Sequence, residues 1–223
     1  MTIKRGQDWG RTAALPADAP VAATDAQLAD LIAPVLIVAH RATAPGRSAP
    51  SPSPSPSVRP IGLVGGDLCR TLGGRGDRQR LTQTDAQQLP IDALIVTIDD
   101  RADEPLIAVA HVVIRRSWWH GPVHALMNAQ YLGRYDVAPR SHPNDGRVDV
   151  IETTALSLPD RVKGWRRLPT GAHLPHPAIT ERRVTETSYT FERAMTVWVD
   201  GRRRAQAHTV HVRVMPDAFV VAI

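Results

Sequence analysis

The sequence predicts a mainly β protein with a small α/β part: an antiparallel β-sandwich, residues 75–223, docked on a reduced N-terminal α/β segment, residues 1–74. Two observations predict the sandwich. From Pro90 onward, apolar residues recur with a period of two in short runs, as in strands that bury one face. Turn residues separate these runs, and Asp200-Gly201 is typical of a β-hairpin. Mixed helix and strand signals upstream predict the smaller part.

Helix and strand signals alternate in the first 74 residues. Met1–Arg5 predicts a short strand, and Thr24–Gln27 is a capping-box pattern that opens a helix. Pro34 interrupts the pattern, so residues 34–39 either continue as a kinked helix or form a buried strand. Pro60–Val64 then predicts a buried strand, and residues 68–72 predict a short helix that ends at a glycine pair.

Residues 43–57 alternate serine and proline over most of their length. Such a run lacks apolar side chains and many backbone donors, so it predicts an extended, solvated linker or loop. A partner-docking proline motif is the alternative interpretation, and a plain spacer is favoured over it.

The second part predicts strands at short spacing and one helix, which is typical of a sandwich or barrel. The helix covers residues 158–168. The predicted strands are Ile91–Ile98, Leu106–Arg115, Val123–Gln130, Arg147–Thr153, Arg183–Phe191, Met195–Asp200, Thr209–Val214 and Ala218–Ile223.

Composition narrows the function classes. The chain has 223 residues, a formal net charge of +5 and a single cysteine, Cys69, so no internal disulfide can form. No apolar run is long enough for a transmembrane helix, and the N-terminus lacks the features of a secretory signal, so we expect a cytoplasmic protein. The basic charge suits a phosphate-rich partner. No nucleic-acid motif accompanies it, so we do not expect a nucleic-acid partner.

Several motifs allow both a structural and a chemical interpretation. Gly62–Asp67 lies between a strand and a helix, where glycine N–H groups can approach a phosphate, or where Asp67 simply caps a tight turn. Asn144-Asp145-Gly146 is a turn, or Asp145 holds a divalent cation. Arg202–Arg204 is a solvated hairpin tip or an anion contact. His173 and His176 have a metal-like spacing but no convincing further ligands, so loop packing is favoured.

Three stretches together resemble the bacterial diacylglycerol kinases and the sphingosine-kinase-like lipid kinases, whose second domain is a β-sandwich shared with NAD kinases. The resemblance covers about residues 60–223. The matching residues, in chain order, are Pro60-Ile61-Gly62, Gly66–Gly73, Leu89–Asp92, Asn128, Gly133, Ala138-Pro139, Asp145-Gly146, Val148-Asp149-Val150, Gly171–His173, His176-Pro177, Val199–Arg202 and Pro216-Asp217-Ala218.

The chain departs from this family in three respects. The family carries an upstream Gly-Gly-Asp-Gly-Thr nucleotide loop, and nothing in residues 1–57 matches it. The family's hairpin glutamate, implicated in catalysis, is Arg202 here, and a guanidinium cannot accept a proton or help to bind a cation. The N-terminal nucleotide domain is also about half its expected size.

The resemblance implies site residues, cofactors and partners. Asp67 and Asp200 are the candidate catalytic carboxylates, and Asp145 is the candidate metal ligand. The candidate phosphate or ligand contacts are Gly65, Gly66, Arg70 and Arg202. ATP and Mg²⁺ are the implied cofactors, and a small molecule or lipid is the implied ligand. Peripheral membrane contact and a homodimer stay open.

Three hypotheses follow for the function. The first is a degenerate relative that binds a nucleotide, a phospholipid or another phosphorylated small molecule, with Asp67 and Arg70 lining a cleft opposite Asp145 and Asp200. The second is an active ATP-dependent lipid kinase with a rearranged phosphate site. The third is a scaffold or dimerisation module that uses exposed tryptophans and sheet edges.

Overall fold

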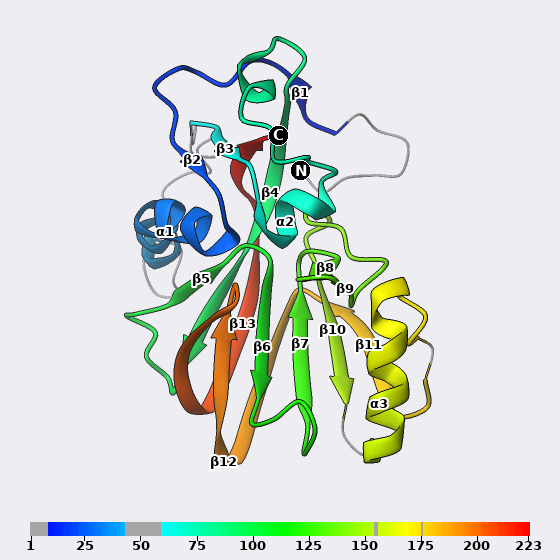
Figure 1. The fold of residues 1–223 in the computed structure, drawn as a ribbon. Coiled ribbons are helices and arrows are strands. Elements are labelled where there is room, and N and C mark those ends of the chain that lie inside the picture. The colour runs from blue at the N-terminus through cyan, green and yellow to red at the C-terminus, as the bar shows by residue number, and fades with distance from the viewer. Residues whose placement is uncertain (1–8, 43–58, 154–155, 175) are drawn as a thin grey trace.

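One curved antiparallel sheet contains most of the strands, in a computed structural model that describes residues 9–42, 59–153, 156–174 and 176–223 (Figure 1). The order along the sheet is β1-β4-β13-β12-β6-β7-β10-β11, and β2, β3 and β5 attach to its side. The expected strand Met1–Arg5 and the Ser/Pro run 43–57 lie outside the described residues.

The structure gives the following bounds. The helices are α1 (Asp25–Ala42), α2 (Gly66–Thr71) and α3 (Leu158–Arg167), with 3₁₀ turns at Arg80–Thr82 and Leu168–Thr170. The strands are β1 (Arg11–Thr12), β2 (Val21–Ala22), β3 (Ile61–Leu63), β4 (Gln87–Ile98), β5 (Leu106–Ala108), β6 (His111–Arg115), β7 (Val123–Met127), β8 (Tyr131–Leu132), β9 (Tyr135–Asp136), β10 (Val148–Thr153), β11 (Ile179–Val184), β12 (Glu186–Val199) and β13 (Arg202–Ala222).

The expected α/β part is present at one end of the sheet. The capping box forms: the Thr24 hydroxyl accepts a hydrogen bond from the Gln27 N–H at 3.2 Å, and the Gln27 side chain accepts one from the Ala23 N–H at 2.9 Å. α1 continues through Pro34, so the kinked-helix interpretation is confirmed and the buried strand is wrong. Among the described residues, no helix is both long and apolar enough to cross a membrane.

The small part and the sandwich share one core. β3 pairs in parallel with β2 and also with the end of β13, where Val221 lies opposite Ile61. A single buried cluster joins both sides of this junction: Leu28, Ile32, Leu36, Leu63, Leu68, Ile91, Ile95, Phe219 and Val221 are among its members. The site described below lies at this junction.

The sandwich core is a second apolar cluster between the two curved halves of the sheet. Period-two side chains of β4, β6, β7, β10, β12 and β13 fill it, including Leu94, Ile114, Leu126, Val150, Val197 and Val212. The antiparallel β-sandwich is therefore confirmed.

Strand lengths differ from the prediction near the C-terminus. The predicted strand Arg183–Phe191 is wrong, because β11 ends at Val184 and β12 runs from Glu186 to Val199. The two predicted strands after residue 208 form one strand, β13. A bulge between Met215 and Phe219, with Asp217 at φ 49°, breaks the alternation there, so the sequence pattern looks like two strands.

Replacing Phe219 by alanine should lower the free energy of unfolding by about 3–5 kcal/mol, because the ring is buried in the core that joins the two parts. Urea denaturation followed by circular dichroism measures the change. Val38→Ala is the control, since Val38 is 66% exposed on α1 and should change stability by less than about 0.5 kcal/mol. Equal effects of the two variants would contradict the shared core.

Candidate functional site

The turn between β12 and β13 places the Asp200 carboxylate under the start of β6. Asp200 and Gly201 both have positive φ, 46° and 77°, as the predicted Asp-Gly hairpin turn requires. The carboxylate accepts hydrogen bonds from the backbone N–H groups of Val109, Ala110 and His111 at 2.9–3.0 Å. These three donors fix the segment that leads into β6.

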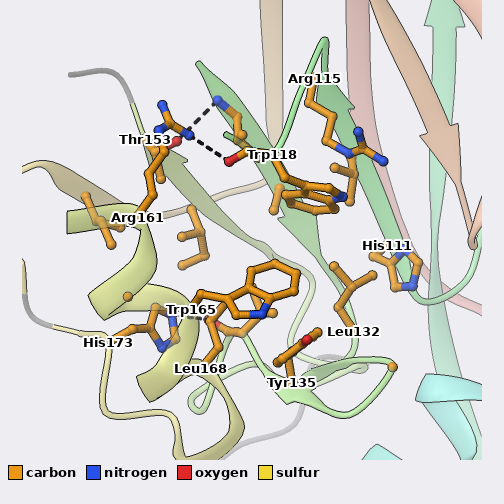
Figure 2. Close-up of a pocket in the computed structure, with 18 of the residues that line it drawn as sticks. His111, Arg115, Trp118, Leu132, Tyr135, Thr153, Arg161, Trp165, Leu168 and His173 are labelled. Carbon is orange, nitrogen blue, oxygen red and sulfur yellow. Dashed lines mark hydrogen bonds between the residues drawn. The ribbon is translucent and has the colours of Figure 1, made fainter. Parts of the chain in front are cut away.

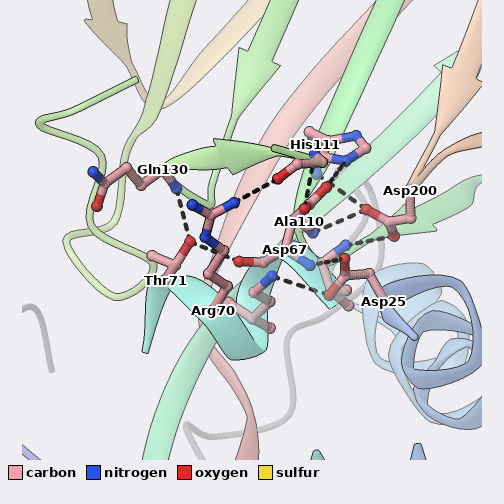
Figure 3. A network of polar contacts seen from close by, with 11 residues as sticks. Asp25, Asp67, Arg70, Thr71, Ala110, His111, Gln130 and Asp200 are labelled. Atoms are coloured by element: carbon pink, nitrogen blue, oxygen red, sulfur yellow. Dashed lines mark hydrogen bonds and ion pairs between the residues drawn. The ribbon is translucent and has the colours of Figure 1, made fainter. Parts of the chain in front are cut away.

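Asp67 contacts the same segment through a side chain. One carboxylate oxygen lies 3.0 Å from Nε2 of His111, and the other accepts the Gly133 N–H at 2.8 Å (Figure 3). The sequence prediction that Asp67 and Asp200 lie near each other is consistent with this arrangement, since both bind His111, one through the ring and one through the backbone. Their catalytic role stays a prediction.

Asp25, the first residue of α1, occupies the N-terminus of α2. Its carboxylate accepts the N–H groups of Asp67 at 2.6 Å and Leu68 at 3.1 Å. Gly66 has φ 94°, and a Cβ added there would lie 2.4 Å from Oδ1 of Asp25. Gly65 and Gly66 were predicted to bind a phosphate through their N–H groups. The structure places a carboxylate of the chain itself, that of Asp25, beside this segment.

Burial and mutual charge shift the pKa values in this group. Burial, followed by the charge of Asp200, raises the pKa of Asp25 to about 6. Burial also raises the pKa of Asp200, against the opposing charge of His111 and the three N–H donors. Burial alone would lower the pKa of His111, but the hydrogen bond that the ring donates to Asp67 and the charges of the nearby carboxylates raise it instead. The carboxyl groups of Asp25, Asp67 and Asp200 thus outnumber the one imidazole, that of His111, which could balance their negative charge.

Arg70 and Thr71 tie α2 to the β7–β8 connection. The Arg70 guanidinium donates to the Gly133 carbonyl at 2.9 Å and lies 3.9 Å from the centre of the Tyr131 ring. The Thr71 hydroxyl accepts the N–H of Gln130 at 3.0 Å. Arg70 is thereby positioned beside the Asp67–His111 pair, and its ligand role stays a prediction.

Arg202 lies on the other side of the Asp200 turn, beside α1. Its guanidinium pairs with Asp30 at 2.6 Å, on the surface. Arg202 and Asp200 line a cavity of about 390 Å³ between α1 and the β4–β5 connection, together with Arg41, Asp103 and Glu104. The lining mixes both charges, and the position of the family glutamate is taken by a paired cation.

Asp145 belongs to a different polar cluster. Its carboxylate lies 3.5 Å from Arg183 and accepts the Arg147 N–H. Next to it, the buried Asp92 accepts the Gly146 N–H at 2.7 Å, and burial raises the pKa of Asp92 to about 7. Among the described residues, Asp145 makes no hydrogen bond or ion pair with His111 or Asp67. Its metal role stays a prediction.

An apolar cavity of about 410 Å³ lies between α3 and the outer face of β6, β7 and β10 (Figure 2). Trp118, Leu132, Tyr135, Trp165 and Leu168 line it, with the aromatic rings facing the space. His111 lies at one end, and its Nδ1 is buried without a hydrogen-bond partner. The cavity therefore joins an apolar interior to the Asp67–His111 pair.

Cations without carboxylate partners lie along the same cavity. The Arg115 guanidinium lies over the rings of Trp118, at 4.2 Å, and Trp198, at 4.9 Å. Arg161, on α3, donates to the carbonyls of Leu156, Trp118 and Gly121 and so fastens α3 to the β6–β7 loop. Within the described ranges, no salt bridge is found for either arginine.

The described site residues do not form a cluster that fits a Mg²⁺ ion. In the part of the chain that the structure describes, no group of three or more His, Cys, Asp or Glu side chains could hold a metal ion. The carboxylates of Asp25, Asp67 and Asp200 each already accept two or more hydrogen bonds or an ion pair. These contacts orient the carboxylates toward donors of the chain itself, and they do not converge as a set of oxygen ligands of the kind that a hard cation requires.

A family model described as the YegS C-terminal NAD kinase beta sandwich-like domain matches residues 93–223. The chain belongs to this family. The lipid-kinase resemblance of the sequence is thereby confirmed, and the matched range includes most of the sandwich, all the residues that line the apolar cavity and the Asp200 turn.

Solved structures agree at the level of the fold. A diacylglycerol kinase from Bacillus anthracis matches with a TM-score of 0.53 and 12% identity, over 73% of this chain and 66% of that one. A second structure from the same organism matches with a TM-score of 0.56 and 11% identity, over 73% and 68% of the two chains. No curated protein matches the sequence significantly. The chain thus spans about two thirds of the length of these kinases.

Sequence reasoning missed Asp25 and His111. Asp25 was identified as part of a capping box, and the structure uses its side chain on a different helix. His111 opens β6, where three buried apolar residues, Val112–Ile114, follow it before Arg115. A histidine directly before a buried apolar run was the available signal, although its partner Asp67 is 44 residues away.

Replacing Asp67 by asparagine should lower the pKa of His111, because the amide keeps a hydrogen bond and loses the charge that stabilises the imidazolium. NMR titration of the ring measures this. The pair stabilises the native protein fully below the ordinary histidine value of 6.5, and this contribution is lost as the pH rises through the raised pKa. Asp30→Asn is the control, since Asp30 pairs with Arg202; an equal shift there would contradict the assignment.

Gly66→Ala should destabilise the protein by more than Gly73→Ala does. Both glycines have positive φ, 94° and 80°, so each substitution costs about 1–2 kcal/mol in backbone strain. Only the Cβ at residue 66 meets Asp25, whereas nothing lies within 4 Å at residue 73. An additional loss of about 1–3 kcal/mol is therefore expected in urea denaturation. Equal losses would show that Asp25 moves away from α2 without cost.

Proposed function

We propose that the chain is a lipid-kinase-like protein that binds a lipid without transferring a phosphoryl group to it. The observation that carries this proposal is the apolar cavity that ends at His111. Its volume falls within the range of about 300–1,000 Å³ found for small-molecule sites. The lipid hydrocarbon would occupy the space between α3 and the sheet, where each buried methylene contributes about 0.8 kcal/mol.

The polar end of the cavity suits a hydroxyl-bearing head group. His111 Nε2 is engaged by Asp67, and Nδ1 is buried with no partner among the described residues. A neutral imidazole with its proton on Nε2 would accept a hydrogen bond from a ligand hydroxyl at Nδ1, and a charged imidazole would donate one to an oxygen. The contact would satisfy a buried atom that otherwise costs free energy.

Three features argue against phosphoryl transfer. Asp25 occupies the N-terminal N–H groups of α2, Arg202 replaces the family's hairpin glutamate, and Asp200 accepts three backbone N–H groups. Phosphoryl transfer relies on electrostatic clamping of the phosphates by cations and on a metal ion. The residues at this site supply neither arrangement, so binding is favoured over catalysis.

Filling the cavity tests the proposal. Gly164 lines the cavity from α3, and a Cβ added there meets nothing within 4 Å. Gly164→Phe should weaken binding of a fluorescent single-chain lipid at least tenfold. α3 should still form, because phenylalanine has a higher helix propensity than glycine. Gly164→Ala is the matched control and should keep nearly full affinity. Equal affinity of both variants would place the lipid elsewhere.

A phosphorylation assay separates this proposal from the active-kinase hypothesis. Radiolabelled ATP with Mg²⁺ and a panel of diacylglycerols and sphingoid bases should give no labelled lipid. A thermal shift with ATP and Mg²⁺ should likewise be absent. Product formation that is lost in Asp200→Asn would overturn the proposal and establish a kinase. No lipid binding and no product together would favour the scaffold hypothesis.

A further inference from the structure

The side of β6 that faces the apolar cavity carries a polar group at each end. Side chains alternate along a strand, so His111, Val113 and Arg115 point to one side, and all three line the cavity. The Cα atoms of His111 and Arg115, at the two ends of β6, are about 13 Å apart in an extended strand. The cavity therefore extends along β6 from His111 to Arg115 (Figure 2).

Two N–H groups at the Arg115 end of the cavity are buried without an acceptor. The Nε atom of Arg115 and the indole Nε1 atom of Trp198 have no hydrogen-bond partner among the described residues. Trp198 lies opposite Val113 in the pairing of β12 with β6, so its side chain is on the same side of the sheet, and it also lines the cavity. Both groups can only donate hydrogen bonds. An acceptor at this end would therefore satisfy two buried donors, which otherwise cost free energy.

Arg115 is a cation without a carboxylate partner among the described residues. No Asp or Glu belongs to the set of residues that line the cavity, all of which the structure describes. The Arg115 guanidinium lies over the rings of Trp118 and Trp198, and within the described ranges it makes no hydrogen bond or ion pair. Burial lowers the pKa of Arg115, and no carboxylate opposes this effect. The guanidinium stays charged at neutral pH, so the cavity contains a cation that lacks an anion.

The other basic groups along the cavity are already engaged or neutral. Arg161 donates through all three guanidinium nitrogens to backbone carbonyls. His111 pairs with Asp67 at 3.0 Å. Burial lowers the pKa of His173, which favours the neutral form of its ring. One unpaired positive charge in the lining, that of Arg115, thus remains to attract a ligand.

We propose that the cavity binds a single-chain fatty acid whose carboxylate contacts Arg115 and Trp198. The assignment rests on the proposed lipid binding and specifies the head group. A carboxylate accepts charge-assisted hydrogen bonds from a guanidinium, and these are about twice as strong as neutral ones. Its single negative charge balances the one unpaired cation. A phosphate monoester carries about −1.5 to −2 charges near pH 7 and would leave excess negative charge beside apolar side chains.

The volume and length of the cavity suit one chain. Its volume of about 410 Å³ lies near the lower limit of the range of about 300–1,000 Å³ for small-molecule sites, which favours one acyl chain over two. The hydrocarbon would run along Val113 toward His111. With carbon–carbon bonds of about 1.5 Å, roughly ten to twelve carbons span the distance of about 13 Å between the two ends of β6. A hydroxyl at the far end of such a chain would reach Nδ1 of His111.

Isothermal titration calorimetry of the full chain with dodecyl ligands tests the head group. Dodecanoate should bind at least about tenfold more tightly than methyl dodecanoate, because the ester has the same chain and no charge. Dodecyl phosphate should bind more weakly than dodecanoate, since its second charge is unbalanced. ω-Hydroxydodecanoate should bind about fivefold more tightly than dodecanoate, because its hydroxyl satisfies the buried nitrogen of His111.

Variants of the arginine test the residue. Arg115→Gln should weaken dodecanoate binding at least about tenfold and change methyl dodecanoate binding by less than about threefold, because only the acid uses the charge. Arg115→Lys keeps the charge and should restore part of the preference for the acid over the ester. The matched control is Arg116→Gln, which removes the same charge from the exposed position directly after β6 and should leave the affinity for dodecanoate within about twofold of the native value.

The outcomes separate the head group from lipid binding itself. An acid preference that is lost in Arg115→Gln and kept in Arg116→Gln supports the carboxylate assignment. Equal binding of dodecanoate and its methyl ester, equal loss of both in Arg115→Gln, or tighter binding of dodecyl phosphate would overturn that assignment while lipid binding stands. No gain from the ω-hydroxyl would overturn the orientation toward His111. If no dodecyl ligand binds the native protein, the proposed lipid binding fails and the carboxylate assignment fails with it.

Discussion

The three hydrogen bonds from Val109, Ala110 and His111 to the Asp200 carboxylate organise the centre of the protein. They hold the last hairpin of the sandwich against the segment that begins β6. His111 then reaches Asp67 on α2, and Asp25 on α1 caps the same helix. Elements far apart in the sequence are thereby joined by buried polar contacts, which are costly to leave unmade and so specify one arrangement.

The same network engages the candidate catalytic carboxylates in contacts within the chain. Carboxylates that hold backbone N–H groups act as structural anchors: Asp200 fixes the start of β6, and Asp25 fixes the start of α2. The Asp25 carboxylate accepts the N–H groups at the start of α2, where a bound anion would otherwise accept them. Most polar groups of this site bind one another, which is typical of a structural role. The apolar cavity beyond His111 is the region left for a ligand.

Much of the fold was predictable, because alternation of apolar residues is a local property of the chain. The sandwich, the Asp-Gly hairpin and the capping box all follow from such short-range patterns, and the family resemblance added the order of the motifs. Bulges were not predictable, since two extra residues around Asp217 interrupt the pairing of a continuous strand. For the site, Asp67 and Asp200 were identified from motifs. The partners Asp25 and His111 depend on packing between distant segments, which no local pattern encodes.

Two arginines of α3 show why position matters more than residue type here. Arg161 and Arg166 are on the same helix. The Arg161 guanidinium donates hydrogen bonds to carbonyls and so fastens α3 to the β6–β7 loop, whereas Arg166 lies exposed. The first residue holds the wall of the cavity in place, and the second contributes to the charge outside it. A ten-residue helix can therefore close an apolar space on one side and present a basic, apolar surface on the other. The polar network at His111 fixes the opposite end of that space, so hydrogen bonds of the chain hold both ends of the cavity in place.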